Sequence, residues 1–507
     1  MKERSQSKKN FKKNLWFGVK LLLVAIQLMV SLLLIISLIR MEIVENWIIV
    51  VISLILAVLL VLNIIILLAL RRSKIWAQVS CSIVAIVCVV GGIFALKYAD
   101  AFNGFLNKIT VKEPETKLYN VLAINDEIKD LGQLNHKSVG FLKTDPEVGK
   151  AEQLLEKLAT IKIDHYDDVG TMLEVLRNGL TDAIVLDNSW SDVMSDDSEN
   201  EKYSIEDLHV VYSFKITIDG DEVEISDKDI TLEPFIIYLS GSDSRNGLKS
   251  VGRSDVNIIV VVNQKQGKVL LVSIPRDTYV QLHGTTGLKD KLTHAGVYGI
   301  EKSKTTIEDF LGINIDHTIK VSFDTVVKVV DALGGIDINS DMDLTLSASG
   351  ERCHFVEGKQ HVDGNCALRF ARERKSYTLG DRHRGYNQQE VIRAIIEKFS
   401  GSKNYLLKVP EILNIAADSF ETSLGRDDII GFVRSQIINP VNWEVESISV
   451  DGRGTMEPTY SMGANLPLYV MIPYEDSVVN AVNKINEYLK VEVEEVVDEV
   501  VEETQAE

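Results

Sequence analysis

Three long apolar runs separated by short polar stretches occupy the first hundred residues. They are Leu21 to Ile39, Trp47 to Leu70 and Ile75 to Leu96. Each is about as long as the roughly 20 residues that a helix needs to cross a bilayer. The first run exceeds the apolar core of about 7 to 15 residues of a signal peptide, and no small-residue cleavage site follows Arg40. We therefore predict a membrane anchor with three transmembrane helices over residues 1–99.

Basic residues flank these runs unevenly, and this predicts their orientation. The N-terminal tail and the loop at 71–74 are rich in Lys and Arg. The loop at 41–46 carries Glu42 and Glu45 and is bordered by Arg40 alone. Because basic loops are retained on the cytoplasmic side, the N-terminus is expected inside and everything after Lys97 outside. The chain is predicted to be a multi-pass cell-membrane protein with an extracytoplasmic C-terminal domain.

Residues 100–230 show short strand patterns that alternate with helical ones. Such alternation predicts a small parallel sheet with crossover helices, which we interpret as an accessory α/β domain. A stretch from Ser191 to Lys202 is rich in Asp, Glu and Ser and is predicted to be a loop. The predicted strands are 138–142, 161–166, 182–187 and 209–218, and the predicted helices are 148–158 and 170–177.

A second α/β domain is predicted over residues 231–489. It opens with an apolar strand at 235–241, followed by a hairpin whose strands, 257–262 and 268–274, flank a turn at 263–267. The last residues, 490–507, are acids interleaved with valine and are expected to be a solvated tail. Helical patterns within the domain lie at 304–311, 323–333, 387–399 and 477–489.

Charge is distributed as unevenly as hydrophobicity. Of 54 Lys and Arg and 73 Asp and Glu, 12 and 3 lie in residues 1–99, which leaves 42 against 70 in the remainder. The predicted extracytoplasmic part is therefore near −28, and such an acidic surface argues against nucleic acid as a partner. A cluster of arginines within this acidic part of the chain therefore needs a specific explanation at the place where it lies.

Two of the four cysteines fall in the extracytoplasmic part, where disulfides persist. Cys353 and Cys366 flank two glycines in CHFVEGKQHVDGNC, a stretch able to fold back on itself. A structural disulfide is the favoured interpretation. Two free thiols remain an alternative, as does a zinc site with His354 and His361, although the spacing fits no common finger pattern.

The hairpin register brings two opposite charges together. Asp255 and Arg276 are symmetric about the turn, so unbulged pairing places them side by side at the open end. Asp243 follows the strand at 235–241 and is expected at a neighbouring strand end. Two carboxylates at adjacent strand ends form a reasonable Mg²⁺ (or Mn²⁺) site, although an Asp in a Gly-Ser-Asp-Ser stretch also suits a plain turn.

A second polar cluster lies at the start of the helix predicted to contain 387–399, which would begin near Asp381 or Gly385. Asp381, Arg384 and Gln388 share one face of that helix at spacings i, i+3 and i+7, and Arg372 precedes them. Guanidinium forks suit bidentate capture of phosphate oxygens, so these arginines, with Arg253 and Arg276, indicate a pyrophosphate site. Arg374 and Arg382 fit ordinary surface charges equally well.

At these residues the sequence resembles the LytR-CpsA-Psr family of wall glycopolymer transferases. The resemblance rests on motifs in a fixed order over about residues 235–489, and the three apolar runs followed by an α/β unit resemble the capsule-associated branch. One departure is Asn387, where many members carry Arg. The motifs are GSDSR at 241, RSD at 253, SIPRDTYV at 273, KLTHA at 291, VVDALGGIDI at 329, HVDGNCALRFARER at 361 and GDRHRGYNQQ at 380.

The resemblance implies a role for each matched residue. Asp243 and Asp255 would hold Mg²⁺, while Asp255, Arg276 and Asp381 would form the catalytic centre. The implied fold is a central mixed sheet between helices, with a greasy channel that strand residues such as Ile259 and Val261 would line, unless they are plain core. The implied pyrophosphate contacts are Arg253, Arg276, Arg372, Arg384 and Gln388.

The implied activity is transfer of an anionic or capsular glycopolymer from a polyprenyl-pyrophosphate carrier to peptidoglycan, through a phosphodiester link. Membrane, lipid-linked polymer and peptidoglycan are then the expected partners. Two alternatives stay open: a polyprenyl-pyrophosphate phosphatase that uses water as acceptor, and a non-catalytic membrane regulator that attenuates transcription. The sequence shows no helix-turn-helix pattern for the regulator.

Overall fold

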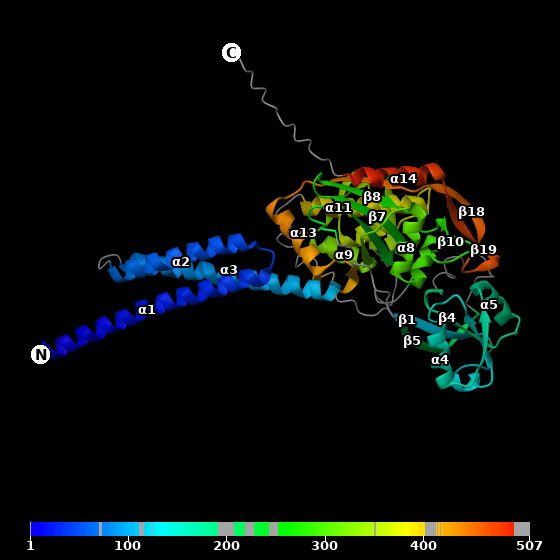
Figure 1. The fold of residues 1–507 in the computed structure, drawn as a ribbon, viewed down its shortest axis with the longest axis horizontal. Helices are drawn as coiled ribbons and strands as arrows, with labels where there is room; N and C mark the ends of the chain where they lie inside the picture. Colours follow the sequence, from blue (N-terminus) through cyan, green and yellow to red (C-terminus); the bar gives the residue numbers. More distant parts are fainter. Residues whose placement is uncertain are drawn as a thin grey trace, which may run out of the picture.

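The computed structural model describes most of the chain (Figure 1). Asp243, the predicted loop at 191–202 and the acidic tail from residue 491 lie outside the described residues. The described residues are 2–69, 74–110, 116–124, 126–190, 207–218, 228–242, 252–348, 351–400, 412, 414–415 and 417–490.

Three N-terminal helices lie to one side of the remaining domains (Figure 1). They are α1 (Lys2–Met41), α2 (Asn46–Ala69) and α3 (Lys74–Thr110). Their apolar stretches Leu21–Arg40, Asn46–Ile65 and Ser82–Ile109 are long and apolar enough to cross a membrane. The prediction of three such helices is confirmed. Inside the bundle, Asn63 Nδ2 donates to Gln27 Oε1 at 3.1 Å, which pairs two polar side chains within an apolar contact.

Helix α3 extends well past the apolar run predicted at Ile75 to Leu96 and into the folded domain. Its last turns bury Phe102, Phe105 and Ile109 against α13 (Arg426–Ile438) and the residues just before it. From α13, Arg434 Nε donates to the carbonyl of Ile43 at 3.1 Å, in the turn between α1 and α2. Arg426 contacts the same turn. The anchor and the domain are thus joined by a continuous helix and by side-chain contacts.

The accessory domain is a five-stranded sheet in the order β3-β2-β4-β1-β5. The predicted strands and helices are present, and β2 pairs in parallel with β3 and β4. The predicted parallel sheet is thus present in these three strands, but the whole sheet is mixed, because β1, which the strand pattern missed, lies antiparallel between β4 and β5. The elements are β1 (Thr116–Ala123), η1 (Leu131–Leu134), β2 (Ser138–Leu142), α4 (Val148–Leu158), β3 (Lys162–Tyr166), α5 (Val169–Arg177), β4 (Ala183–Asp187) and β5 (His209–Thr217).

The second domain is built on a mixed six-stranded sheet in the order β16-β11-β6-β7-β8-β17. The predicted hairpin is confirmed, since β7 pairs antiparallel with β8 with Asn263 opposite Lys268. Strands β11 and β17 add in parallel to either side of the β6-β7-β8 unit. The strands are β6 (Phe235–Ser242), β7 (Val256–Asn263), β8 (Lys268–Ser273), β11 (His317–Ser322), β16 (Phe420–Thr422) and β17 (Glu444–Ser449).

Helices cover both faces of this sheet. Alternate strand residues, Ile259 and Val261 among them, bury one face against α8 (Ile300–Leu311) and α14 (Glu475–Tyr488). The opposite face, with Ile258 and Leu271, packs against α11 (Asp381–Ser400). Period-two burial on both faces explains why these strands are apolar almost throughout. Ile259 and Val261 lie in this packed core.

Several shorter elements complete the domain. A satellite core forms where α9, α10 and α11 pack on the strands β12 to β15. The elements are β9 (Tyr279–Val280), β10 (Asp290–Lys291), α7 (Leu292–Ala295), η2 (Gly296–Tyr298), α9 (Phe323–Ala332), β12 (Ile336–Ser340), β13 (Leu344–Ala348), β14 (Glu351–Phe355), β15 (Gly358–Val362), α10 (Gly364–Arg372), η3 (Ala417–Ser419), β18 (Gly452–Thr459) and β19 (Gly463–Pro473).

The two domains share an apolar core. Leu173 and Leu176 of α5 and Trp190 after β4 are buried with Met462 and Leu468 around β19. The amide of Val169 donates to the carbonyl of Ser461 at 2.9 Å. A Cβ at Gly170 would lie 2.3 Å from the carbonyl oxygen of Met462, so this approach requires a residue without a side chain. The accessory domain is therefore packed against the second domain rather than tethered to it.

Cys353 and Cys366 form a disulfide that joins β14 to the first turn of α10. Replacing both by serine is expected to lower the free energy of unfolding by about 3 kcal/mol, because the bond closes a short loop in the unfolded chain. Thermal or urea unfolding of the purified chain measures the loss. Non-reducing peptide mapping should recover the two residues joined, and recovery of both as alkylatable thiols would contradict the pairing.

Candidate functional site

The centre of the site is an ion pair at the open end of the β7–β8 hairpin. Arg276 Nη1 donates to Asp255 Oδ1 at 2.9 Å, and the side chains are 9% and 10% exposed. The register of the hairpin continues past its last ladder pair, since the amide of Ile274 donates to the carbonyl of Asn257 at 2.9 Å. The contact predicted from the sequence is thus present.

A buried polar network holds the segment that carries Arg253 and Asp255. Ser254, between them, is bonded to Ser240 Oγ at 2.8 Å and to the Tyr238 hydroxyl at 3.1 Å. The Tyr238 hydroxyl also donates to Asn257 Oδ1 at 2.7 Å. Because each of these groups has a partner, burial of the polar cluster fixes the loop instead of destabilising it.

The start of α11 brings in the second set of charges. Arg384 Nη2 lies 2.7 Å from Asp381 Oδ1, and Arg276 Nε lies 3.6 Å from the same oxygen. Gln388 is buried one turn further along the helix. A Cβ at Gly385 would lie 2.6 Å from Ser273 Oγ, so glycine allows the helix to meet the end of β8. The predicted face of Asp381, Arg384 and Gln388 therefore adjoins the hairpin pair.

Two other side chains of α11 fix its position against the sheet. Gln389 Nε2 donates to the carbonyls of Leu271 and Ile448, at 2.9 and 2.7 Å, on two strands. Asn387, the position that departs from the family pattern, is buried and donates to the carbonyl of Phe370 at 3.1 Å. Its side chain connects α11 to α10 and is directed into the protein.

The surrounding charges set the protonation of the carboxylates. Burial opposes ionisation of Asp255, but the charges of Arg276, Arg253 and Arg384 outweigh it and lower its pKa to about 2. For Asp381 the balance is reversed: burial raises its pKa, Arg384 lowers it, and repulsion from Asp277 helps to keep it raised. Asp255 is accordingly a permanent anion, whereas Asp381 holds a proton more readily than an ordinary Asp.

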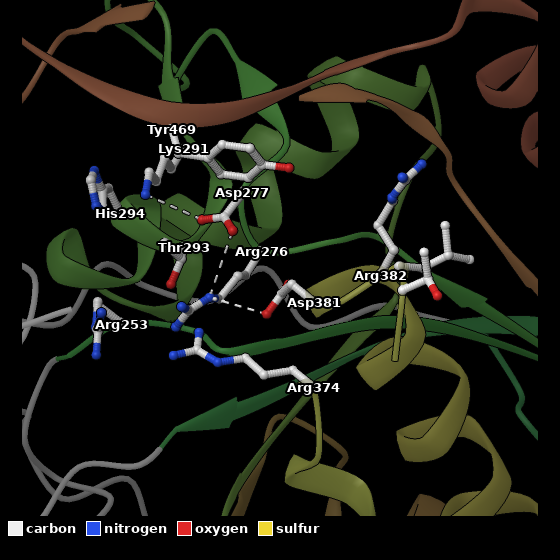
Figure 2. Close-up of a pocket in the computed structure, with 13 residues that line it drawn as sticks. Arg253, Arg276, Asp277, Lys291, Thr293, His294, Arg374, Asp381, Arg382 and Tyr469 are labelled. Atoms are coloured by element: carbon white, nitrogen blue, oxygen red, sulfur yellow. Dashed lines mark ion pairs between the residues drawn. The ribbon is translucent and has the colours of Figure 1, made fainter. Parts of the chain in front are cut away.

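A cavity of about 380 Å³ opens beside this cluster (Figure 2). Its wall contains five Lys or Arg against two Asp, so it is locally cationic within a strongly acidic domain. Such a wall suits a ligand that carries several negative charges. The lining residues are Arg253, Arg276, Asp277, Lys291, Thr293, His294, Arg374, Thr378, Leu379, Gly380, Asp381, Arg382 and Tyr469.

The structure distinguishes three arginines between the end of α10 and the start of α11. Arg374 is half-buried in the cavity wall, and Figure 2 shows its guanidinium beside that of Arg276. Among the described residues, no carboxylate forms an ion pair with Arg374. Arg372 is exposed and lies over the ring of Phe323 at 4.6 Å, outside the cavity lining. Arg382 donates to Asp451 and to the carbonyl of Gly452, which directs it away from the cluster (Figure 2).

The described residues of the site fit the expected cation in part. Asp255 supplies a buried, ionised oxygen donor next to a cavity suited to phosphate, the arrangement in which Mg²⁺ is held by one or two carboxylates plus phosphate oxygens and water. The second predicted ligand, Asp243, lies outside the described residues. Within the described part of the chain, no three metal-ligating side chains gather. The donors present fit a cation that the substrate helps to bind.

Four titratable lining residues have no role predicted from the sequence: Asp277, Lys291, His294 and Tyr469. Lys291 Nζ lies 3.3 Å from Asp277 Oδ1, and both side chains are about one-tenth exposed. His294 and Tyr469 contribute an imidazole and a phenol to the wall. Three of the four lie in two family motifs, SIPRDTYV at 273 and KLTHA at 291. The motifs therefore marked this part of the chain as functional, but they did not indicate which of their side chains face the cavity.

Comparison with known proteins was made against this geometry. The LytR_cpsA_psr family matches residues 195–472, more than half of the chain. The polyisoprenyl-teichoic acid–peptidoglycan teichoic acid transferase TagU of Bacillus mycoides is 37% identical over 198 residues, which are 39% of this chain and 62% of TagU. The enzyme of the same name from Enterococcus faecalis is 37% identical over 199 residues, 39% of this chain and 64% of that protein. The chain thus spans less than two thirds of either relative.

Among solved structures, B. subtilis TagV is 29% identical and is aligned over 51% of this chain and 97% of its own, with a TM-score of 0.42. A TM-score below 0.5 carries no weight by itself. The family match covers the mixed sheet, the hairpin pair and the first turns of α11, where the predicted site residues meet. This chain belongs to the LytR-CpsA-Psr family.

Proposed function

We propose that the protein transfers a glycopolymer from a polyprenyl-pyrophosphate carrier to peptidoglycan and leaves a phosphodiester link between them. The observation that carries the proposal is the cationic cavity around the Asp255–Arg276 pair, within a domain of opposite overall charge. The names of the TagU relatives agree with this chemistry. The polymer is of the anionic class, teichoic or capsular.

The arginines of the cavity would bind the pyrophosphate. Arg276 and Arg384 are buried and oriented by Asp255 and Asp381, so their guanidinium groups need little reorganisation on binding. Arg253 and Arg374 add charge from two other segments. Gln388 extends the α11 face, and Arg372 would contact the ligand only from outside the cavity. Charge that develops on the departing lipid phosphate is then stabilised by groups already in place.

Mg²⁺ or Mn²⁺ would be held by Asp255 together with Asp243 and phosphate oxygens. When bound, such a cation neutralises charge on the phosphoryl oxygens and orients them. Asp255 would keep its acceptor role at every physiological pH, since its pKa is about 2. The protein's share of the chemistry is to keep that carboxylate ionised and to place the arginines around the same phosphates.

The proposed topology places the cavity outside the membrane. The three apolar helices anchor the chain, the basic N-terminal tail lies in the cytoplasm, and the domains after α3 are extracytoplasmic. A lipid-linked polymer and peptidoglycan are both accessible there. Nucleic acid is not proposed as a partner.

The test uses the full chain in lipid nanodiscs with a labelled oligosaccharide on a short polyprenyl pyrophosphate, and with isolated peptidoglycan as acceptor. Label is expected to move to peptidoglycan, and the transfer should stop when EDTA removes divalent cations. Release of the labelled sugar phosphate into water without transfer would indicate the phosphatase instead. Binding of the lipid with neither reaction would indicate the regulator.

A further inference from the structure

A buried carboxylate–imidazole pair lies in the wall of the cavity. His294 Nδ1 is 2.7 Å from Asp290 Oδ1, and the two side chains are 2% and 0% exposed. Ser461 Oγ is 3.1 Å from the same nitrogen. Asp290 also accepts from the amides of Lys291 and Ser461, at 2.8 and 2.9 Å. A buried carboxylate this well supplied with donors is held in one orientation.

The hydrogen bonds assign the tautomer of His294. Asp290 is an acceptor, so Nδ1 carries the proton and Nε2 of the neutral ring keeps its lone pair. Among the described residues, no donor is bonded to Nε2, and His294 lines the cavity. Its free nitrogen is therefore available to a group that enters the cavity.

The backbone fixes this pair relative to the pyrophosphate site. The amide of Thr293 donates to the carbonyl of Arg276 at 2.9 Å, and the amide of Ser254 donates to the carbonyl of Thr293 at 3.3 Å. Short helix α7 is thus bonded to both segments that carry the central ion pair. Figure 2 shows His294 on the same side of the cavity as Arg253, across from Arg382.

The accessory domain contacts the imidazole of His294. The indole of Trp190 meets the His294 ring edge-on, with ring centres 5.9 Å apart, and Trp190 is 1% exposed. This contact covers one side of the imidazole and limits its rotation. Together with Asp290, it holds the ring ready for proton transfer.

We propose that His294 is the general base that activates the acceptor hydroxyl of peptidoglycan, with Asp290 as its positioning residue. The inference rests on the proposed function. The hydroxyl oxygen attacks the phosphorus next to the polymer's first sugar, and its proton moves to His294 Nε2. The bond from that phosphorus to the bridging oxygen breaks, and its electron pair leaves with the polyprenyl phosphate. The proton then passes from Nε2 to the departing phosphate or to water.

Asp381 is the competing base, and its surroundings argue against it. Burial raises its pKa and makes it a stronger base than an ordinary Asp, but its Oδ1 faces Arg384 at 2.7 Å and Arg276 at 3.6 Å, so this oxygen is directed at two cations. A carboxylate engaged in this way orients arginines better than it removes protons. His294 instead offers a lone pair on the cavity side and has a carboxylate behind it.

The decisive variant is His294→Asn, because the Asn amide can still donate to Asp290 while the Nε2 acceptor is lost. We expect kcat for transfer to peptidoglycan to fall about 10² to 10⁴-fold, the usual contribution of a general base. Binding of the lipid-linked substrate and the thermal unfolding midpoint should stay near the parental values. The matched control is His283→Asn, since His283 and Asp309 form the same 2.7 Å pair on the surface, about half exposed. It should transfer at the parental rate.

The pH profile of kcat provides a second readout that a structural role would not change. The kcat of the parental protein should fall as the pH is lowered, because a protonated imidazole cannot accept a proton. This fall at low pH, the acid limb of the profile, should be absent from the residual activity of His294→Asn. The titratable and charged groups around His294 are Asp290, Lys291 and Arg253, with Tyr298 and Tyr460 close to Asp290. Asp290→Asn should reduce kcat with little change in KM.

The outcomes separate this inference from the proposed function. If the parent transfers and folded His294→Asn transfers at the same rate with the same acid limb, the base is another group and our assignment is wrong. If Asp381→Asn removes the acid limb and His294→Asn does not, Asp381 is that base. If the parent itself transfers nothing while lipid binds, the proposed function fails before His294 is tested.

Discussion

Replacing Asp255 by alanine is expected to reduce polymer transfer to peptidoglycan by about 10²- to 10³-fold, which is the scale on which removal of one preorganised group acts. The side chain has two functions. It orients Arg276 through the 2.9 Å contact, and it is the described member of the proposed cation site. Transfer of label from the lipid carrier in nanodiscs, over a range of Mg²⁺ concentrations, measures both.

Asp255→Asn makes the test sharper. It keeps an acceptor for Arg276 but removes the negative charge, so the apparent affinity for Mg²⁺ should weaken while the fold is kept. Asp337→Ala is a suitable control, because Asp337 is about half exposed and pairs only with His361 among the described residues. Full activity in folded Asp255→Asn, with unchanged Mg²⁺ dependence, would remove Asp255 from the cation site. Since its pKa is about 2, any acid limb above pH 4 must come from another group.

The second large effect is expected from lysine substitutions that keep charge but remove the planar fork. Arg384→Lys and Arg374→Lys should each lose most of the transfer rate, by about 10² to 10³-fold, because an ammonium cannot replace a bidentate contact to two phosphate oxygens. Arg384 is buried beside Asp381, and Arg374 extends into the cavity beside Arg276. Initial rates with the labelled lipid substrate, together with its binding affinity, measure the loss.

Arg382→Lys is the internal control for these variants. Arg382 lies on the same helix turn and in the same cavity wall, but its guanidinium is bonded to Asp451 and to the carbonyl of Gly452. It should be almost silent. Arg372→Lys should cost less than Arg374→Lys, because Arg372 lies over Phe323 outside the cavity lining. Parental rates in Arg384→Lys and Arg374→Lys would mean that simple charge attraction is sufficient.

Local pattern was enough to predict the β7–β8 hairpin, helix α11 and the central contact. The pairing of Asp255 with Arg276 follows from the turn position and the period-two geometry of a hairpin, and the structure contains it. The helix that carries Asp381 and Arg384 was equally visible from its spacing. In both cases the partners lie within one supersecondary unit, so sequence separation alone determines the geometry.

Contacts between distant segments could not be derived in this way. Strand β1 was missed because its order in the sheet depends on antiparallel pairing with β4 and β5. Which of Arg372 and Arg374 lines the cavity depends on where α10 ends and on the ring of Phe323, which comes from another helix. The pairing of His294 with Trp190 joins two domains, and neither residue has a pattern that points to the other.

Helix α3 connects the apolar N-terminal helices to the folded domain without a break. Its 37 residues correspond to about 55 Å of helix, well beyond the roughly 30 Å of the bilayer core. The excess is packed against α13, and Arg434 and Arg426 hold the turn between α1 and α2 from the same helix. In the proposed topology, this packing would keep the cavity at one height above the lipid surface. Under the proposed function, the site would then reach only the layer of wall within a fixed distance, so attachment would be confined to the newest material next to the membrane.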